Sequence, residues 1–560
     1  MMNMRHLSII LTVSLFLCAL APVNAQEHKR VEVTKNYTHE VSPAKKIIAP
    51  TEINDTQDID PTITYDVSPE TWQIELEDHN FKPARANYWD YNRAEHFFAE
   101  LATGYPLVSD ATLRYTTYNT RVGYFGVGIE HDGNFAKKIG GDGLKRSMAD
   151  SYAISNRVNV GGGVIAGRQI FEARADYDYS LLNRYAELNP SKRLNFHDAN
   201  LVLRYGDDFA DLSRLNFAIE ARGGYWGHVV PPIACDIMST SEIRAGIVGD
   251  VARDFTGNVV GLRAGFDMWK GDALTGYKNL SFNVAARYAR DFGIVDVQAE
   301  LKYMYDKVSH RAKASHFIMP SARVSIDLGK VGIMPFVEIN TDVKQNSIEA
   351  IYDANPYIAF YPMQYEFAKM APTLNYNVHV GISGTDRGSK LAYRVYLGAD
   401  FMRDKLFWYV NEVGTFGFAQ DNNSRPYVGA EVEYHPVGGL TIAASARAHF
   451  DDTSSIYAVS DPAVVADVKV EYALKRWNFS LSGDFTGKRR WSYMANEMGE
   501  VAMALEAPAV FDLEAGIGFR ATDAVEVYAK GYNLLNQKIY DYAYYYRNGI
   551  GFMVGAKIDF

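Results

Sequence analysis

The side chains that most often perform catalysis or bind metals are thinly spread in this chain. Its thirteen histidines are scattered, and no His-Glu-x-x-His or Cys-x-x-Cys pattern places metal ligands together. Gly161-Gly162-Gly163 lies in a strand–turn region and not before a helix, so it does not predict a phosphate-binding loop. No Ser–His pair stands out as a nucleophile with its base. We therefore expect no catalytic residues, no cofactor and no metal site, and a protein that is not an enzyme.

The N-terminus has the features of a secretory signal peptide over residues 1–25. Arg5 supplies the positive charge, residues 7–21 form the apolar region, and Val23-Asn24-Ala25 predicts cleavage after Ala25. Cys18 lies in the removed segment and lacks the small preceding residue that lipid attachment requires. Cys235 is then the sole cysteine of the mature chain, so no intramolecular disulfide is expected.

The last twelve residues alternate strictly between two kinds of side chain. One face carries Ile550, Phe552, Val554, Ala556, Ile558 and Phe560, and the other carries Gly549, Gly551, Met553, Gly555, Lys557 and Asp559. Because strand side chains alternate with a period of two, this pattern predicts a strand with one apolar face. The terminal Phe560 resembles the assembly signal of bacterial outer-membrane barrels, which implies the barrel-assembly machinery as a partner. The alternative is an edge strand of a soluble β-sandwich.

The same alternation recurs from about Arg93 to Phe560. Charges of both signs fall on one face only, and burying each unpaired in a dry core would cost roughly several kcal/mol. We therefore expect one face to line a wet lumen and the other to contact outer-membrane lipid. The predicted lumen-facing residues are Glu514, Arg520, Glu526, Lys530, Lys557 and Asp559, and the predicted lipid-facing residues are Phe511, Ile517, Val527, Ile558 and Phe560.

Short and long connections alternate between these runs, as in bacterial barrels. Short turns are predicted at 252–257, 289–293, 328–330, 384–388, 435–439, 475–476 and 521–523. Longer segments are predicted near 132–151, 182–194, 227–240, 270–278, 305–316, 343–373, 403–424, 451–461, 488–508 and 535–547. The sequence predicts an all-β fold: one transmembrane antiparallel β-barrel of about 22 strands over residues 93–560. Thirteen per cent aromatic residues, with 38 Tyr, agree with aromatic girdles.

Residues 26–92 differ in character, because prolines punctuate them and no period is sustained. We interpret them as an extended periplasmic arm with one short strand at Trp72–Leu76, which docks on a partner or threads the lumen. A disordered leader is the alternative.

A family resemblance enters at Tyr532-Asn533-Leu534-Leu535-Asn536-Gln537-Lys538-Ile539-Tyr540. This run, followed by a loop and a final strand ending in Phe560, resembles the C-terminus of TonB-dependent outer-membrane receptors of a Bacteroidota type. The resemblance implies a transport protein in the outer membrane of a Gram-negative bacterium. A 22-stranded lumen is normally plugged, yet about 67 residues precede the barrel, too few for a folded plug. We therefore expect a barrel that lacks a full plug domain.

Val31, Glu32, Val33 and Thr34 resemble a TonB box, a segment that pairs with an edge strand of the energy-coupling protein. The alternative is a chance β-prone sequence. The aromatic segment 355–365 folds inward to narrow the lumen, presents a surface to a ligand or partner, or rests on lipid headgroups.

The sequence is consistent with two main functions. The first is transport of an unidentified solute, and the alternative is a structural or assembly subunit whose complex partner fills the lumen. An outer-membrane enzyme is a further alternative. The net charge of −10, with no basic stripe, argues against nucleic acid as a partner.

Overall fold

The structure is a computed structural model that describes residues 96–560, with gaps at 120–121, 141–146, 188–192, 230–239, 273–275, 330–331, 360–368, 387, 389, 451, 454–456, 458–459 and 497–499. The predicted signal peptide, the arm at 26–92 and the strand at Trp72–Leu76 lie outside the described residues, so they stay predictions. The first described strand begins at Phe97.

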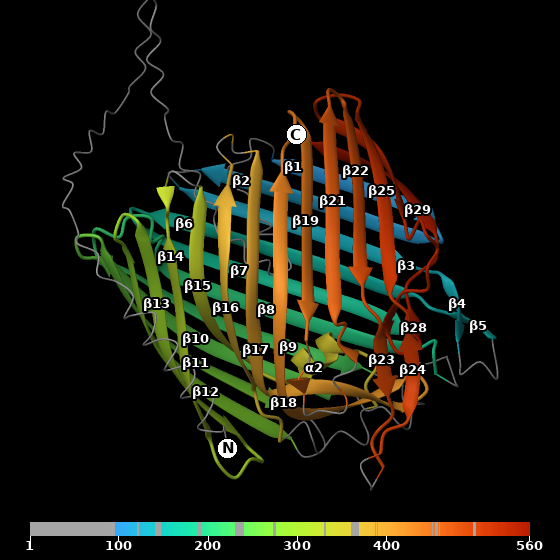
Figure 1. Cartoon of the computed structure of the whole chain (residues 1–560), viewed down its shortest axis with the longest axis horizontal. Coiled ribbons are helices and arrows are strands. Elements are labelled where there is room, and N and C mark those ends of the chain that lie inside the picture. The colour runs from blue at the N-terminus through green and yellow to red at the C-terminus, as the bar shows by residue number, and fades with distance from the viewer. Residues whose placement is uncertain are drawn as a thin grey trace, which may run out of the picture. The chain divides into compact units, whose positions relative to one another are not determined.

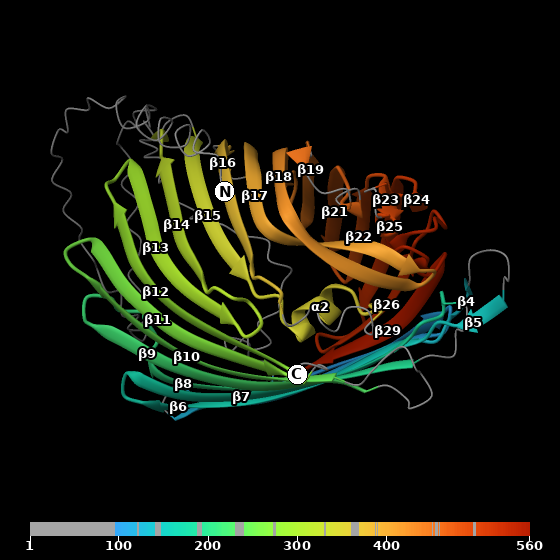
Figure 2. The same cartoon turned by 90° about the horizontal axis from the view of Figure 1, so that it is seen from below.

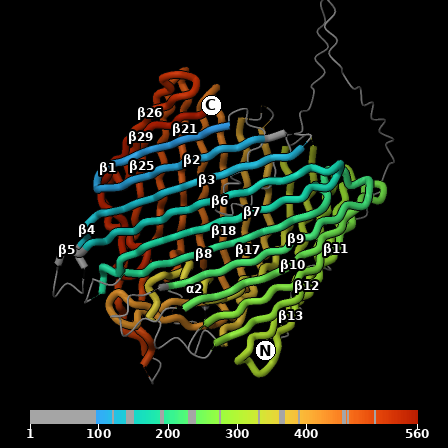
Figure 3. The backbone as a smooth tube through the Cα atoms, turned by 180° about the vertical axis from the view of Figure 1, so that it is seen from behind, coloured from blue at the N-terminus to red at the C-terminus, as the bar shows by residue number. Residues whose placement is uncertain are grey.

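The described chain forms a closed antiparallel β-barrel (Figures 1 and 3). The main sheet has 23 strands, of which β20 (Asp452–Thr453) is a two-residue strand beside β18, and the other 22 form the wall. These are β1 (Phe97–Tyr105), β2 (Val108–Asn119), β3 (Gly123–Asn134), β6 (Ala153–Ala166), β7 (Gln169–Asn183), β8 (Arg193–Asp207), β9 (Asn216–Val229), β10 (Thr240–Asp254), β11 (Asn258–Gly271), β12 (Tyr277–Asp291), β13 (Val295–Val308), β14 (Ser315–Ile326), β15 (Ile333–Lys344), β16 (Thr373–Thr385), β17 (Leu391–Glu412), β18 (Thr415–Tyr434), β19 (Leu440–His449), β21 (Val464–Leu474), β22 (Trp477–Thr486), β25 (Val510–Arg520), β26 (Val525–Tyr532) and β29 (Gly551–Asp559). The predicted fold class is confirmed.

The barrel closes where its first and last strands meet. β1 pairs antiparallel with β29, from Phe98 opposite Asp559 to Tyr105 opposite Phe552. The carbonyl oxygen of Phe560 accepts hydrogen bonds from the backbone nitrogens of His96 at 2.9 Å and Phe97 at 2.8 Å. Closure leaves no unpaired sheet edge at this junction.

Alternation along each strand separates an apolar outer face from a charged inner one. On β11, Val260, Leu262 and Phe266 are exposed on the outside. The charged residues Arg263 and Asp267 of the same strand lie on the inner face, and Asp267 pairs across strands with Arg222 at 2.8 Å. A soluble monomer seldom exposes so continuous an apolar surface, so the outer face has the character of a surface that contacts hydrocarbon.

Both ends of the described wall lie at the same end of the barrel as the short turns. All seven predicted short turns coincide with connections between consecutive strands. At the turn after β10, Thr256 and Gly257 adopt φ of 59° and 82°, and the Gly257 nitrogen donates to Asp254 Oδ1 at 2.7 Å. We call this end the turn end and the opposite one the loop end.

The loop end carries the longer connections and small elements of their own: β4 (Lys137–Gly140), β5 (Ser147–Asp150), α2 (Ile348–Ala354), β23 (Arg489–Ser492), β24 (Met503–Ala507), β27 (Tyr540–Tyr542) and β28 (Tyr545–Tyr546). The prediction of a loop at 403–424 is wrong, because β17 and β18 continue as a hairpin with a two-residue turn at Val413-Gly414. The hairpin persists because neighbouring loops bury its tip, a tertiary effect. Among the described residues, no helix is long and apolar enough to cross a membrane.

Candidate functional site

The connection between β15 and β16 turns into the barrel and forms the short helix α2 (Figure 2). The Ser347 hydroxyl caps it by accepting a hydrogen bond from the Ala350 nitrogen at 3.2 Å. Ile348, Ile351 and Tyr352 lie on one face of the helix, and each is at most 3% exposed. A seven-residue helix is marginal by itself, so contacts with the barrel wall hold it in place.

Aromatic residues of β8 and β9 receive this apolar face. The Tyr352 ring lies 5.8 Å from Phe196, 5.2 Å from Trp226 and 5.0 Å from His228, measured between ring centroids. The hydrophobic cluster continues through Tyr277, Tyr409 and Phe418 to Ile358 in the segment after α2. This aromatic cluster holds the connection that contains α2, called here the inward loop, against β8, β9 and β12 on one side and against β17 and β18 on the other.

The start of α2 is fixed by buried polar groups on β10 and β12. A carboxylate oxygen of Glu242 accepts from the Ile348 nitrogen at 2.9 Å and from the Tyr277 hydroxyl. Arg244, two residues along β10, forms an ion pair with Glu349 in the first turn of the helix. Glu242 is fully buried, so losing one of these donors would leave a costly unsatisfied carboxylate.

A second cluster joins four more loop-end segments. Val410 and Phe416 at the tip of the β17–β18 hairpin pack with Ala543 and Tyr545 of the β27–β28 hairpin and with Trp491 of β23. Tyr185 and Ala186, from the connection after β7, complete the cluster. The loop end of the described barrel is therefore covered by packed loops on its inner side.

Tyrosine hydroxyls tie these segments to one another. Tyr545 donates to the Gly414 carbonyl at 2.8 Å, and Tyr542 donates to the Ala354 carbonyl, at the end of α2, at 2.9 Å. The rings of Tyr357 and Tyr545 stack with their centroids 3.5 Å apart. Burial raises the pKa of Tyr542 to about 12, so its hydroxyl stays a donor at neutral pH.

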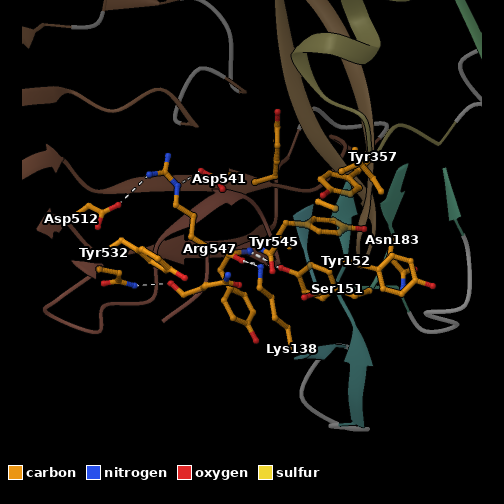
Figure 4. A pocket seen from close by; sticks show the side chains of 18 of the residues that line it. Lys138, Ser151, Tyr152, Asn183, Tyr357, Asp512, Tyr532, Asp541, Tyr545 and Arg547 are labelled. Atoms are coloured by element: carbon orange, nitrogen blue, oxygen red, sulfur yellow. Dashed lines mark hydrogen bonds and ion pairs between the residues drawn. The ribbon is translucent and has the colours of Figure 1, made fainter. Parts of the chain in front are cut away.

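Residues of the loop end line an open pocket of about 350 Å³, shown in Figure 4 and called here the tyrosine chamber. Its size lies within the range of small-molecule sites. The lining comprises seven tyrosines with amide, acidic and basic side chains: Tyr152, Tyr185, Tyr357, Tyr532, Tyr542, Tyr545, Tyr546, Asn134, Asn183, Asn533, Asn548, Asp512, Glu514, Asp541, Lys138 and Arg547, with Ser151, Ala153 and Leu182.

The two cations of the chamber, Arg547 and Lys138, have different surroundings. Arg547 lies between two carboxylates, 2.9 Å from Asp541 and 3.2 Å from Asp512. The Lys138 ammonium donates to the Tyr546 carbonyl at 2.6 Å and lies over the ring of Tyr546. Burial lowers the pKa of Lys138 to about 8, and Asp541 opposes that shift.

Such a lining suits a small polar molecule that also has an apolar face. Tyrosine rings offer flat apolar surfaces, while amides, carboxylates and the two cations hydrogen-bond groups at the edge of a ligand. Among the described residues, no group of three or more His, Cys, Asp or Glu side chains is placed to hold a metal ion. The tyrosine rings and the polar groups of the chamber can bind and orient such a molecule.

The structure places the residues selected from the sequence as follows. Glu514 lines the chamber and lies 2.7 Å from Lys530. Glu526 accepts from Asn478 at 3.0 Å, and Lys557 lies 3.7 Å from Glu100. The backbones of Arg520 and Asp559 are bonded at the turn end, where their strands finish.

On the opposite face, Ile517, Val527, Ile558 and Phe560 are exposed and Phe511 is half-buried. The contact of these two faces with water and lipid stays a prediction, as does the assembly role of Phe560. The residues that resemble a TonB box, Val31, Glu32, Val33 and Thr34, lie outside the described residues.

Sequence reasoning missed the tyrosine chamber. Its lining comes from segments near 134–153, 182–185, 357, 512–514 and 532–548, which only the closed barrel brings together. One signal was available, because five of the eight residues from Tyr540 to Arg547 are tyrosines. For the aromatic segment 355–365, the described part turns inward, with Ile358 buried and the Ala359 nitrogen donating to the Phe416 carbonyl at 2.8 Å.

Comparison with known proteins finds the fold but no close relative. No family model and no curated protein sequence matches. Among solved structures, the copper transporter OprC matches with a TM-score of 0.63 and 14% identity, over 83% of this chain and 81% of that one. The ferric enterobactin receptor PfeA of Pseudomonas aeruginosa matches at 0.65 and 10%, over 84% and 81%. The siderophore receptor PirA of Acinetobacter baumannii matches at 0.64 and 8%, over 83% and 80%. The chain has the receptor-like barrel fold of these proteins.

Proposed function

We propose that this protein is a transport protein of the Gram-negative outer membrane that binds a small polar solute in the tyrosine chamber and passes it through the barrel. The observation that carries the proposal is the closed 22-stranded wall, apolar outside and charged inside, with a solute-sized chamber at its loop end. The named structural neighbours, a copper transporter, a ferric enterobactin receptor and a siderophore receptor, support transport as the general function. The solute itself is unidentified.

The inward loop closes the lumen in place of a full plug domain in this proposal. The buried face of α2, anchored by Glu242 and by the Phe196–Trp226 wall, supports it. Residues 26–92 are punctuated by prolines, and in this proposal they act as a periplasmic arm after cleavage of the signal peptide behind Ala25. Val31–Thr34 in that arm would pair with the energy-coupling protein by β-strand addition.

The proposal is tested by reconstituting the mature chain in planar bilayers and liposomes. We expect little conductance from the intact protein, because its loop end is covered, and clear conductance once the inward loop is released by Ile351→Ala. A variant without residues 26–92 separates the arm's contribution from that of the loop. If none of the three proteins conducts ions or admits small sugars and amino acids, the transport proposal is wrong.

Purification in gentle detergent distinguishes the alternative function. A lone barrel with measurable flux supports transport. Stoichiometric co-purification with other proteins and no flux would instead indicate a structural or assembly subunit of a larger complex. Mass spectrometry of the mature N-terminus tests the cleavage after Ala25 in the same sample.

A further inference from the structure

In the described wall, the junction between β14 and β15 has the fewest paired residues. Each of these strands has twelve residues, but only four pairs form a ladder, from Ala322 opposite Ile339 to Ser325 opposite Phe336. The flanking junctions, β13 with β14 and β15 with β16, have twelve pairs each. The four pairs lie next to the turn end, so the strands part toward the loop end. We call the parted stretch, residues 315–321 facing 340–344, the seam.

Two features of the chain separate the strands at the seam. Pro320 has no backbone N–H to offer the neighbouring strand, which is why proline in a sheet is typical of an edge. In addition, Gln345, directly after β15, bonds two residues inside the barrel. It accepts from Asn279 of β12 at 3.0 Å and donates to Asp306 of β13 at 3.0 Å. The end of β15 is therefore drawn inward, toward the base of α2, and away from β14.

The two sides of the seam overlap. Phe317 and Met319 alternate with the highly exposed Ile318, so they belong to the inner face of β14. They pack against Val343 and Leu374. Leu374 alternates with lumen-facing asparagines, so it belongs to the outer face of β16, and Val343, its partner in the ladder, belongs to the outer face of β15. The inner face of β14 thus covers the outer face of its neighbours.

Side chains, and not a backbone ladder, hold this overlap together. The Tyr376 hydroxyl donates to the Ile318 carbonyl at 2.9 Å. Thr341 donates through its hydroxyl to the Pro320 carbonyl at 2.5 Å and through its nitrogen to the Ser321 hydroxyl at 3.1 Å. The Arg403 guanidinium lies 4.9 Å from the centre of the Phe317 ring.

We propose that the seam is a lateral portal, which opens to bind the alkyl chain of a membrane amphiphile between its two sides and gives it access to the lumen. Parting the overlap breaks a few side-chain hydrogen bonds, while parting a full ladder in hydrocarbon would leave many backbone groups unsatisfied. Both sides present apolar surfaces, Phe317 and Met319 opposite Val343 and Leu374, which match a hydrocarbon chain and not a polar solute. The proposal rests on the membrane location of the barrel but not on the solute bound in the tyrosine chamber.

Photo-crosslinking tests the portal in vesicles of phosphatidylcholine with radiolabelled acyl chains. Benzoylphenylalanine replaces Phe317, which is 1% exposed in the closed seam and reaches lipid only when the seam opens. Phe336, also buried and facing the lumen, lies in the laddered part of the same junction, opposite Ser325 of β14 and Gly381 of β16, and is the matched control. Phe401, 42% exposed on the outer face, is the positive control. We expect lipid adducts at 317 and 401 and none at 336.

Locking the seam completes the test and separates opening from misfolding. In a background of Cys18→Ser and Cys235→Ser, the pair Ser321→Cys and Thr341→Cys joins the two sides by a disulfide or a short thiol cross-linker. We expect the adduct at 317 to disappear in the locked protein and to return on reduction or with the cross-linker omitted, while the adduct at 401 persists throughout. An absent adduct at 317 in protein that labels at 401, or an adduct that locking leaves unchanged, overturns the portal. Neither result depends on solute flux.

Discussion

Replacing Ile351 by Ala removes part of the apolar face that holds α2 against the wall. Ile351 is fully buried in the cluster with Trp226, Tyr352 and Tyr409. Truncating a buried Ile to Ala typically lowers the stabilising free energy by about 2–5 kcal/mol. The better helix propensity of Ala offsets only about 0.4 kcal/mol of that loss. A net loss of about 3 kcal/mol for the closed loop corresponds to roughly a hundredfold increase in the population of its open form.

Hydrogen exchange measures that population directly. The nitrogens of Ile351 and Asn355 donate within the helix to Ser347 and Ile351, each at 3.0 Å, so they exchange only when α2 opens. We expect peptides covering 348–355 to exchange roughly a hundredfold faster in Ile351→Ala. Peptides from β12, which keeps its ladders on both sides, report whether the barrel itself is intact.

The solvent-facing residue of the same helix supplies the matched control. Asp353 is exposed, and its substitution Asp353→Asn leaves the buried face unchanged, so its exchange should match that of the wild type. Unchanged exchange in Ile351→Ala, or equal acceleration in both variants, would show that the buried face does not hold the loop.

Three further expectations follow from other contacts. Val284 lies on the exposed outer face near the middle of β12, and Val284→Lys should lower the free energy of unfolding in lipid by about 2–4 kcal/mol. Its neighbour Asn283 faces the lumen, so Asn283→Lys should change that free energy little. Equal losses for the two variants in urea titrations would contradict the assignment of faces. Because burial lowers the pKa of Lys138 to about 8, the unfolded chain binds more protons than the folded one between about pH 8 and its ordinary value of 10.5. Stability should therefore rise with pH across that window, and Lys138→Met should remove this part of the slope in denaturant titrations; an identical slope would refute the burial of the ammonium. Tyr542→Phe removes the hydrogen bond to Ala354 and should destabilise the closed position of α2 by about 0.5–1.5 kcal/mol, seen as severalfold faster hydrogen exchange of the helix. An unchanged exchange rate would show that this hydroxyl does not help to hold α2 closed.

The wall of the barrel was predictable because its signal is local. Each strand alternates apolar and polar residues, because one face belongs to the apolar outer surface of the barrel and the other to its charged inner surface. This holds wherever the strand lies in the ring. Leu262 beside Arg263 shows the rule within two residues. Glycines such as Gly257 marked short connections, because the backbone there requires positive φ.

The hairpin at 403–424 shows where local reasoning failed. Its residues Val410 and Phe416 are fully buried in a cluster of loop-end segments, and neither residue lies on an exposed face of the sheet. They stay extended because the β27–β28 hairpin and Tyr185, distant in sequence, bury them. No pattern within the hairpin reports partners that are more than a hundred residues away.

The sequence by itself determined that this chain forms an antiparallel barrel, because apolar and polar residues alternate along the strands and define their outer and inner faces. Only the tertiary structure decided what that barrel contains. The inward turn of α2, the tyrosine chamber and the overlap of β14 on β15 depend on side chains such as Glu242, Tyr542 and Gln345 meeting partners that only ring closure brings near. Their contacts span different strands and loops, so the periodicity of any single segment carries no information about them.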